Sequence, residues 1–425
     1  MKKFQSLKQE ELKTIYDALS SEYKEYQSRG LSLDLSRGKP NSDQLDVSQA
    51  ILTTPMERED CFARSGMDAR NYGEGLPEMK DFFAKLLGIK PERIYVGGNS
   101  SLQLMHDTIA RGMLFGLKNS PRPWCQEKGL KWICVVPGYD RHFGITEIFG
   151  FELVSVKMTE TGPDMNEVER LVKDEKVKGI WGVPKYSNPS GNTYSDETVK
   201  RLASMKCAAP DFTIMWDNAY AVHDLTEEGD KLLDIFAEAE KCGNEDRVFC
   251  FSSTSKITFP GAGVSFMAAS EANLAHLKPY MATQIIGYDK INQLRHLKFF
   301  KNPENVKAHM MRHAAFIKEK FDITLSALSK LEGLDIAEWT KPRGGYFVSL
   351  DLKIGSAKRV FELMKCAGVT LTAVGATYPY KRDPEDKNLR IAPTYPKNDE
   401  LALALEILVL SVKMAAIEKL ISENN

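Results

Sequence analysis

Residues 248–256 read Val-Phe-Cys-Phe-Ser-Ser-Thr-Ser-Lys, and the turn Pro260-Gly261-Ala262-Gly263 follows. The apolar start is typical of a buried strand, and small hydroxyl residues then lead to Lys256. A lysine at the end of a buried strand is costly to desolvate, so its presence there indicates a purpose. One such purpose is a Schiff base with an aldehyde, which removes the charge and activates the amine. Ser253 and Ser255 offer hydroxyl groups to an anion such as phosphate.

Strand and helix patterns alternate on both sides of this segment. Short apolar runs predict strands at residues 93–96, 132–136, 153–156, 179–183, 212–216, 248–251 and 264–268. Helical patterns separate most of them, for example over 102–117 and 196–205. Alternation of this length predicts an α/β domain with a mainly parallel sheet.

The two ends of the chain have different patterns. Apolar residues at helical spacing over 12–26 predict an amphipathic helix that ends near Gly30, followed by an extended segment at 31–35. From about residue 270 the sequence is helical to about 330, with Pro279 and Pro303 as breaks. Strands at 346–350 and 389–391 then mix with helices. We therefore expect a second, smaller α+β domain.

Three more polar motifs follow predicted strands. Trp216 is followed by Asp217-Asn218-Ala219-Tyr220, residues 179–183 by Asn188-Pro189-Ser190-Gly191, and residues 93–96 by Gly97-Gly98-Asn99-Ser100-Ser101. Taken singly, they have ordinary explanations as a helix cap, a loop and a turn. Neither G-x-G-x-x-G nor G-x-x-x-x-G-K-[ST] is present. In a parallel sheet, however, the four motifs converge at one edge, where ligands bind. A lysine, a carboxylate, a phenol, an amide and a phosphate cradle suit an aldehyde cofactor with a pyridine ring and a phosphate.

On these motifs, in order from Arg37-Gly38 to Arg390, the chain resembles the fold-type I, pyridoxal-phosphate-dependent aminotransferases of the class I superfamily. Within it, the chain most resembles the aspartate aminotransferase-like subgroup, often grouped under the MocR-type name. The resemblance implies a large domain at 56–310 that binds pyridoxal 5'-phosphate and a C-terminal small domain at 311–425. The N-terminal helix and arm, residues 1–55, would form part of the small domain.

The resemblance also implies roles for the cofactor site. Lys256 would form the Schiff base and move the proton, and Asp217 would pair with the pyridine nitrogen. Tyr220 and Asn188 would hydrogen-bond the ring oxygen, and Tyr139 would stack on the ring. The residues expected at the phosphate are Asn99, Ser100, Ser101, Ser253 and Ser255.

Other matches concern the substrate and a neighbouring subunit. Arg390, in Asn388-Leu389-Arg390-Ile391, would bind the substrate α-carboxylate, with Asn188 and a backbone group of Gly38 beside it. The alternative for Gly38 is an ordinary turn glycine. Arg295 is either a contact for a side-chain carboxylate or a helix-surface charge. Tyr72, in Asn71-Tyr72-Gly73, would reach the phosphate of a neighbouring subunit and make the active unit a homodimer. The alternative is a glycine-rich surface loop.

The sequence departs from the family pattern after the lysine. Most relatives carry a phosphate-binding arginine there, where this chain has Gly263. Lys185 is one candidate for the missing charge. His309 and His313 are four residues apart, but no H-E-x-x-H motif is present, so we expect a core or solvated pair and no metal.

The predicted reaction is a ping-pong transamination, in which an amino acid gives its amino group to the cofactor and a 2-oxo acid then takes it. Aspartate and 2-oxoglutarate are the expected substrates. One alternative is a carbon–sulfur β-lyase on the same scaffold. Another is a ligand-sensing regulator, but the residues before Ser36 hold one amphipathic helix and leave no room for a winged helix.

Composition excludes several classes of protein. Lys and Arg number 57 and Asp and Glu 58, so a net charge of −1 argues against a nucleic-acid partner. Seven widely spaced cysteines without a C-x-x-C pair predict reduced thiols in a cytoplasmic protein. The N-terminus lacks the apolar run of a signal peptide. The apolar segment Leu401–Ile417 is interrupted by polar residues, so it predicts a buried helix and no membrane span.

Overall fold

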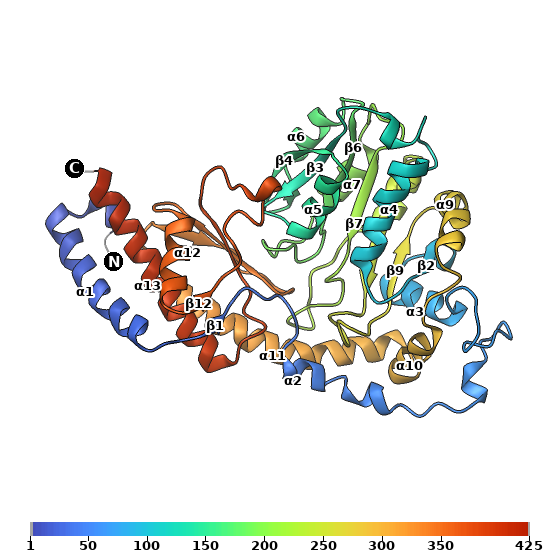
Figure 1. Cartoon of the computed structure of the whole chain (residues 1–425), viewed down its shortest axis with the longest axis horizontal. Helices are drawn as coiled ribbons and strands as arrows, with labels where there is room; N and C mark the ends of the chain where they lie inside the picture. The colour runs from blue at the N-terminus through green and yellow to red at the C-terminus, as the bar shows by residue number, and fades with distance from the viewer. Residues whose placement is uncertain (1–2, 424–425) are drawn as a thin grey trace.

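An eight-stranded sheet forms the centre of the larger part of the molecule (Figure 1). The computed structural model describes residues 3–423. In spatial order the strands are β2 (Ile94–Val96), β9 (Ser265–Ala268), β8 (Val248–Ser253), β7 (Thr213–Asp217), β6 (Val177–Gly182), β3 (Lys131–Val136), β4 (Glu152–Thr159) and β5 (Gly162–Pro163). The five strands from β8 to β4 are parallel, whereas β9 and β5 run antiparallel to their neighbours. The predicted α/β fold with a mainly parallel sheet is confirmed.

Helices cover both faces of this sheet (Figure 1). They are α3 (Pro77–Leu87), α4 (Ser101–Phe115), α5 (Asp140–Ile148), α6 (Met165–Leu171), α7 (Asp196–Ser204), α8 (Ile235–Lys241), α9 (Glu271–Gln284) and α10 (Lys290–Phe300). Successive residues of β3 enter opposite cores: Ile133 lies in one apolar cluster, and Trp132 and Cys134 lie in the other. Because both faces are buried, the parallel strands are continuous apolar runs rather than alternating ones.

The smaller part of the molecule combines the two ends of the chain. Its elements are α1 (Gln9–Ser28), β1 (Leu33–Asp34), α11 (Pro303–Ser329), β10 (Ala337–Trp339), β11 (Val348–Leu352), α12 (Ala357–Cys366), β12 (Val369–Thr370), β13 (Asn388–Ile391) and α13 (Asn398–Glu423). Strands β10, β11 and β13 form an antiparallel sheet, and β1 pairs in parallel with β12. A separate core surrounds α13 and includes Leu12 from α1 and Phe321 from α11. The small domain is therefore α+β, as predicted.

Short helical turns complete the described chain. They are α2 (Ser42–Asp46), η1 (Phe4–Ser6), η2 (Gln49–Thr53), η3 (Glu59–Cys61), η4 (Pro91–Arg93), η5 (Trp124–Gln126), η6 (Glu245–Arg247) and η7 (Pro379–Lys381). Pro303 begins α11, a position where the missing N–H costs nothing. Pro279, by contrast, lies inside α9 and does not end it. Its side chain is exposed. None of the helices within residues 3–423 is long and apolar enough to cross a membrane.

Candidate active site

The polar motifs meet where the parallel strands end. Strand β7 ends at Asp217, whose register partner on β8 is Phe251, two residues before Ser253. Segment 183–192 follows β6, and Tyr139 follows β3 at the first turn of α5. The predicted convergence at one edge of the sheet is what the structure shows.

Lys256 lies beside Tyr220 at this edge. Its Nζ is 4.9 Å from the centroid of the Tyr220 ring. Burial lowers the pKa of the lysine amine, and the negative charge of Asp217 partly opposes that effect. An amine with a lowered pKa is neutral more often, which is the form that attacks a carbonyl group.

Asp217 is buried, and only one of its two carboxylate oxygens has a hydrogen-bond partner within the part of the chain that the structure describes. Its Oδ2 lies 2.9 Å from Nε2 of His142, and the His142 ring stacks on Trp181 with centroids 4.5 Å apart. Its Oδ1 is buried without a hydrogen-bond partner among the described residues. An unpaired buried carboxylate oxygen is costly. A protonated ring nitrogen placed there would satisfy it.

His142 was not predicted from the sequence. It stands one turn after Tyr139 on α5, and the two rings are in edge contact with centroids 4.9 Å apart. That spacing is the only signal in the sequence that links it to the site, because the contact with Asp217 joins residues 75 positions apart.

The two tyrosines stay protonated over the ordinary pH range. Burial raises the pKa of Tyr220 well above its usual value, and raises that of Tyr139 to about 12. The charge of Asp217 raises both further. Each phenol is therefore a hydrogen-bond donor rather than an anion.

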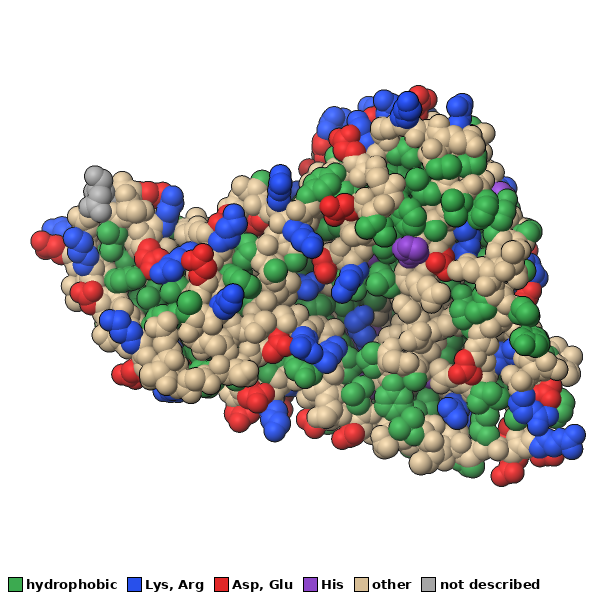
Figure 2. All heavy atoms as spheres, viewed as in Figure 1, with side chains coloured by type: hydrophobic (Ala, Val, Ile, Leu, Met, Phe, Trp, Pro, Cys, Tyr) green, Lys and Arg blue, Asp and Glu red, His purple; other side chains and the backbone are tan. Residues whose placement is uncertain are grey.

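Arg390 enters the site from the small domain. Its Nη1 lies 3.3 Å from Oδ1 of Asn188 and 3.3 Å from Oδ1 of Asp140, both on the large domain. The guanidinium carbon is 5.1 Å from the centroid of the Phe347 ring. The backbone at Gly38 approaches that ring so closely that a Cβ there would overlap it. The site thus lies where the two domains meet, and Figure 2 shows basic side chains along this junction.

The glycine-serine segment before α4 packs against the serines after β8. Ser100 caps α4, and its Oγ accepts from the backbone N–H of Gln103 at 3.3 Å. Ser255 Oγ donates to the carbonyl of Asn99 at 3.0 Å, and Asn99 Nδ2 donates to that of Gly261 at 3.4 Å. The structure therefore brings the two predicted phosphate-binding segments together at a helix N-terminus, which attracts anions.

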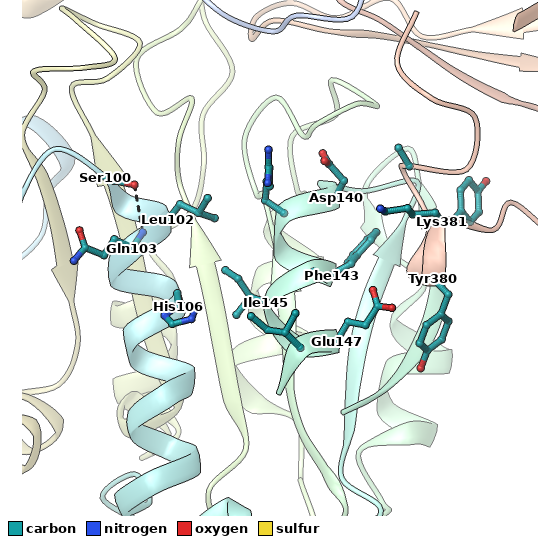
Figure 3. A pocket seen from close by; sticks show the side chains of 15 residues that line it. Ser100, Leu102, Gln103, His106, Asp140, Phe143, Ile145, Glu147, Tyr380 and Lys381 are labelled. Carbon is teal, nitrogen blue, oxygen red and sulfur yellow. Dashed lines mark hydrogen bonds between the residues drawn. The ribbon is translucent and has the colours of Figure 1, made fainter. Parts of the chain in front are cut away.

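A cavity of about 860 Å³ adjoins this segment (Figure 3). Ser100 on α4, Asp140 and Arg141 on α5, and Lys381 on η7 are among its lining residues. The cavity reaches from Ser100, in the predicted phosphate-binding segment, to Asp140, which contacts Arg390. It therefore adjoins both the predicted phosphate site and the predicted carboxylate site.

The structure explains part of the departure at Gly263. A Cβ there would lie 3.0 Å from the backbone nitrogen of Ser255, so the turn leaves little room for a side chain. The suggestion that Lys185 supplies the missing charge is wrong. Lys185 Nζ pairs with Asp224 at 2.8 Å and donates to the carbonyl of Ala221 at 3.0 Å, so its charge is already neutralised.

Other candidates lie apart from these residues. Arg295 is exposed on α10. Tyr72 is 78% exposed. His309 and His313 are a buried core pair, with Nε2 atoms 3.1 Å apart, and no cluster of ligands for a metal occurs in residues 3–423.

The residues present fit pyridoxal phosphate. The orphaned Asp217 oxygen suits a protonated ring nitrogen, and the amine of Lys256 suits the aldehyde. The N-terminus of α4 with its serines suits the phosphate. These three groups differ in chemistry and lie at one sheet edge, as one cofactor with three such groups requires.

Comparison with known proteins agrees with this site. Residues 7–424 match the family model described as aspartate amino-transferase. An aspartate aminotransferase from Corynebacterium glutamicum is 46% identical, over 96% of this chain and 95% of its own length. The crystal structure of an aspartate transaminase from C. glutamicum superposes with a TM-score of 0.95 at 46% identity, covering 98% of this chain and 99% of that one.

A more distant structure shares the fold. LysN, the alpha-aminoadipate aminotransferase of Thermus thermophilus, was solved in complex with N-(5'-phosphopyridoxyl)-L-leucine. It superposes with a TM-score of 0.73 at 21% identity, covering 92% of this chain and 94% of that one. The family match, the fold and the site agree: this chain belongs to the aspartate aminotransferase family and is a fold-type I, pyridoxal-phosphate-dependent aminotransferase.

Proposed function

We propose that this aminotransferase moves the amino group of aspartate to 2-oxoglutarate. The observation that carries the proposal is the contact of Arg390 with Asn188, since it places a guanidinium from the small domain at the sheet edge that holds Lys256 and Asp217. The 46% identity to a relative named aspartate aminotransferase supports aspartate as the donor. Assignment to the MocR-type subgroup is part of the same proposal.

We assign the contacts of the cofactor ring to residues at the ends of β6, β7 and β3. Asp217 holds a proton at the ring nitrogen, and His142 fixes the orientation of that carboxylate through its 2.9 Å contact. Tyr220 donates its phenolic proton to the ring oxygen. Asn188 accepts from Arg390 through Oδ1, which leaves its Nδ2 as a second donor. Tyr139 packs against the ring face.

Lys256 performs the proton transfer in this proposal. Pyridoxal phosphate, when bound, supplies an electron-withdrawing ring that stabilises negative charge on the reacting carbon. The Lys256 amine, with its pKa lowered by burial, accepts the proton from the substrate Cα and returns it on the cofactor side. Burial around Tyr220 excludes water from this transfer.

Arg390 binds the substrate α-carboxylate in this proposal. A guanidinium matches a carboxylate with two parallel hydrogen bonds. Phe347 supports the guanidinium from one side, and Gly38 allows the ring to lie there. We keep Arg295 as a candidate for the side-chain carboxylate of a dicarboxylic substrate, although it is exposed on α10.

The phosphate would be bound without the usual arginine. Backbone N–H groups at the start of α4 and the hydroxyls of nearby serines are the available donors. We assign this role to Asn99, Ser100, Ser101, Ser253 and Ser255.

A homodimer would add Tyr72 of one subunit to the phosphate site of the other. The loop that carries Tyr72 is anchored, because Lys290 Nζ donates to the carbonyl of Gly73 at 3.2 Å. The Tyr72 ring itself is 78% exposed. An exposed aromatic on an anchored loop is suited to contact a partner. Leu114, Phe115 and Ile148 are further exposed apolar residues that a partner would cover.

We propose domain boundaries at residues 1–55, 56–310 and 311–425. Support comes from the packing. The core around α13 draws mainly on residues up to Leu35 and from Ile317 onward, joined by Val183, Tyr186, Tyr220 and Leu225, whereas the cores of the central sheet draw mainly on the residues between. A cytoplasmic location is also proposed, since all seven cysteines are free thiols, as expected in a reducing compartment.

An absorbance titration of the purified holoenzyme tests the function. Aspartate should bleach the visible band of bound pyridoxal phosphate, and 2-oxoglutarate should restore it. Release of oxaloacetate marks a transaminase, whereas release of pyruvate with ammonia or sulfide from cysteine derivatives would indicate a lyase. A protein that binds the cofactor but responds to neither substrate would refute the proposed substrates.

A further inference from the structure

The guanidinium assigned to the substrate carboxylate already has a carboxylate beside it. Asp140 Oδ1 lies 3.3 Å from Arg390 Nη1, which also contacts Asn188. The Arg390 side chain is only 10% exposed, so this ion pair is partly shielded from water. Asp140 is 34% exposed and faces the cavity of Figure 3.

This arrangement opposes the binding of an anion. With Asp140 beside it, Arg390 forms a neutral pair rather than an isolated positive charge. A substrate carboxylate that reached Arg390 while Asp140 stayed in place would lie close to a like charge, which is unfavourable where water is excluded. Either Asp140 leaves Arg390 when the substrate arrives, or the substrate binds against repulsion.

We propose that Asp140 is a resident counter-ion of Arg390 that the substrate α-carboxylate displaces, and that Asp140 thereby determines the affinity for amino acids and oxo acids. The inference rests on the proposed function, in which Arg390 binds that carboxylate. Asp140 is an affinity-determining residue, since it competes with the substrate for one cation and takes no part in proton transfer.

The surroundings of Asp140 accommodate the displaced side chain. Asp140 is the first residue of α5, where the helix dipole favours a negative charge whether or not Arg390 is near. Arg141 and Lys381 line the same cavity, and neither forms an ion pair with another residue in the described part of the chain. In Figure 3 the side chain of Lys381 extends toward the first turn of α5. A freed carboxylate therefore has favourable positions within reach.

A different role for Asp140 makes the opposite prediction. If Asp140 stays on Arg390 and acts mainly by orienting the guanidinium, the benefit of that orientation outweighs the repulsion, and removing the charge weakens carboxylate binding. If the substrate displaces Asp140, removing the charge strengthens binding. The sign of the change in affinity separates the two roles.

The experiment compares Asp140→Asn with the wild-type holoenzyme. Maleate is the probe, because it is a dicarboxylate without an amino or oxo group and cannot turn over. Its binding is followed by the change in cofactor absorbance. Asp196→Asn is the matched control, since Asp196 is also the first residue of a helix, α7, and is exposed. Asp140→Ser is a second variant, in case the asparagine protein folds poorly.

Displacement predicts that Asp140→Asn and Asp140→Ser bind maleate about tenfold more tightly, because a like charge no longer competes. KM for aspartate and 2-oxoglutarate should fall by a similar factor with little change in kcat, and Asp196→Asn should match the wild type. Equal or weaker maleate binding by both Asp140 variants would overturn displacement and leave the proposed function standing. Absence of maleate binding in every protein would count against the dicarboxylate function and this inference together.

Discussion

His142 Nε2 lies 2.9 Å from Asp217 Oδ2, and the histidine ring is stacked on Trp181. The contact fixes one oxygen of the carboxylate and leaves the other, Oδ1, without a partner among residues 3–423. An imidazole therefore holds the carboxylate in one orientation, with its free oxygen available to the cofactor ring.

Replacing Asp217 with Asn should remove the charge that keeps the ring nitrogen protonated while preserving the shape of the side chain. We expect kcat to fall by at least about a hundredfold, since an interaction that matters mainly in the transition state would be lost. Transamination rates and the visible spectrum measure the effect. Asp211→Asn would be a poor control because Asp211 pairs with Lys178 in the core, so the exposed Asp196→Asn is preferable. Activity within a fewfold of the wild type would contradict the role of Asp217.

Replacing Lys256 with Ala should abolish the half-reaction with aspartate, because the chain would lose the amine that transfers the proton. Stopped-flow absorbance with aspartate measures the half-reaction, and added methylamine should restore part of the rate. Lys185→Ala is not a suitable comparison, since Lys185 is buried and pairs with Asp224. The exposed Lys318, paired only with Asp322 on α11, offers a neutral control. Undiminished turnover by Lys256→Ala would refute its assignment.

Replacing Gly38 with Ala should impair binding of the α-carboxylate. The added methyl group would overlap the Phe347 ring, which lies against Arg390, and the ring would have to move. We expect KM for aspartate to rise about tenfold with a smaller change in kcat, as for the loss of uniform binding. Gly144→Ala is the control, because a Cβ at this position of α5 meets no atom within 4 Å. An unchanged KM in Gly38→Ala would show that the position of the Phe347 ring does not affect binding of the substrate carboxylate.

The free energy of unfolding should fall as the pH drops below about 6.5. Burial lowers the pKa of His309 to about 4 and those of His223 and His313 to about 3, so these rings stay neutral in the folded chain. In the unfolded chain they bind protons near pH 6.5, and protonation then favours unfolding. Above pH 6.5 these histidines cost no stability. As the pH falls from there toward 4, each lowers the free energy of unfolding by up to about 1.4 kcal/mol per pH unit.

Urea unfolding at fixed protein and cofactor concentration, at pH 7.5 and 5.5, measures this effect. Exchanging both His309 and His313 for Gln should reduce the dependence on pH, because glutamine does not titrate. His106→Gln is the matched control, because the His106 side chain is 43% exposed and lies outside the buried pair. The same pH dependence in the double variant and the wild type would rule out the buried pair as its source.

Patterns within short segments predicted most of the fold. Each candidate strand from residue 93 to 268 is present, because a strand buried on both faces needs a continuous apolar run, and that signal is local. The convergence of Asp217, Asn188 and Ser100 also followed from sequence, since a parallel sheet places the ends of its strands at one edge.

Contacts between distant side chains were not predictable in the same way. His142 meets Asp217 and Asp140 meets Arg390 across 75 and 250 positions, and no periodicity encodes either pair. The prediction for Lys185 is wrong because its partner Asp224 comes close only when the loops after β6 and β7 have folded. The sequence predicts a break at Pro279, whereas α9 continues through it with the proline on its exposed side.

The parallel pairing of β1 with β12 joins Leu33 to Val369. During synthesis on the ribosome, the first helix and strand emerge long before their partners exist. The large domain can fold in the meantime, since its strands lie between residues 94 and 268. Leu12 and Tyr23 of the nascent N-terminal arm therefore lack their packing partners until α12 and α13 have left the exit tunnel. The small domain, and with it the placement of Arg390 at the active site, therefore depends on contacts between segments that are more than 300 residues apart.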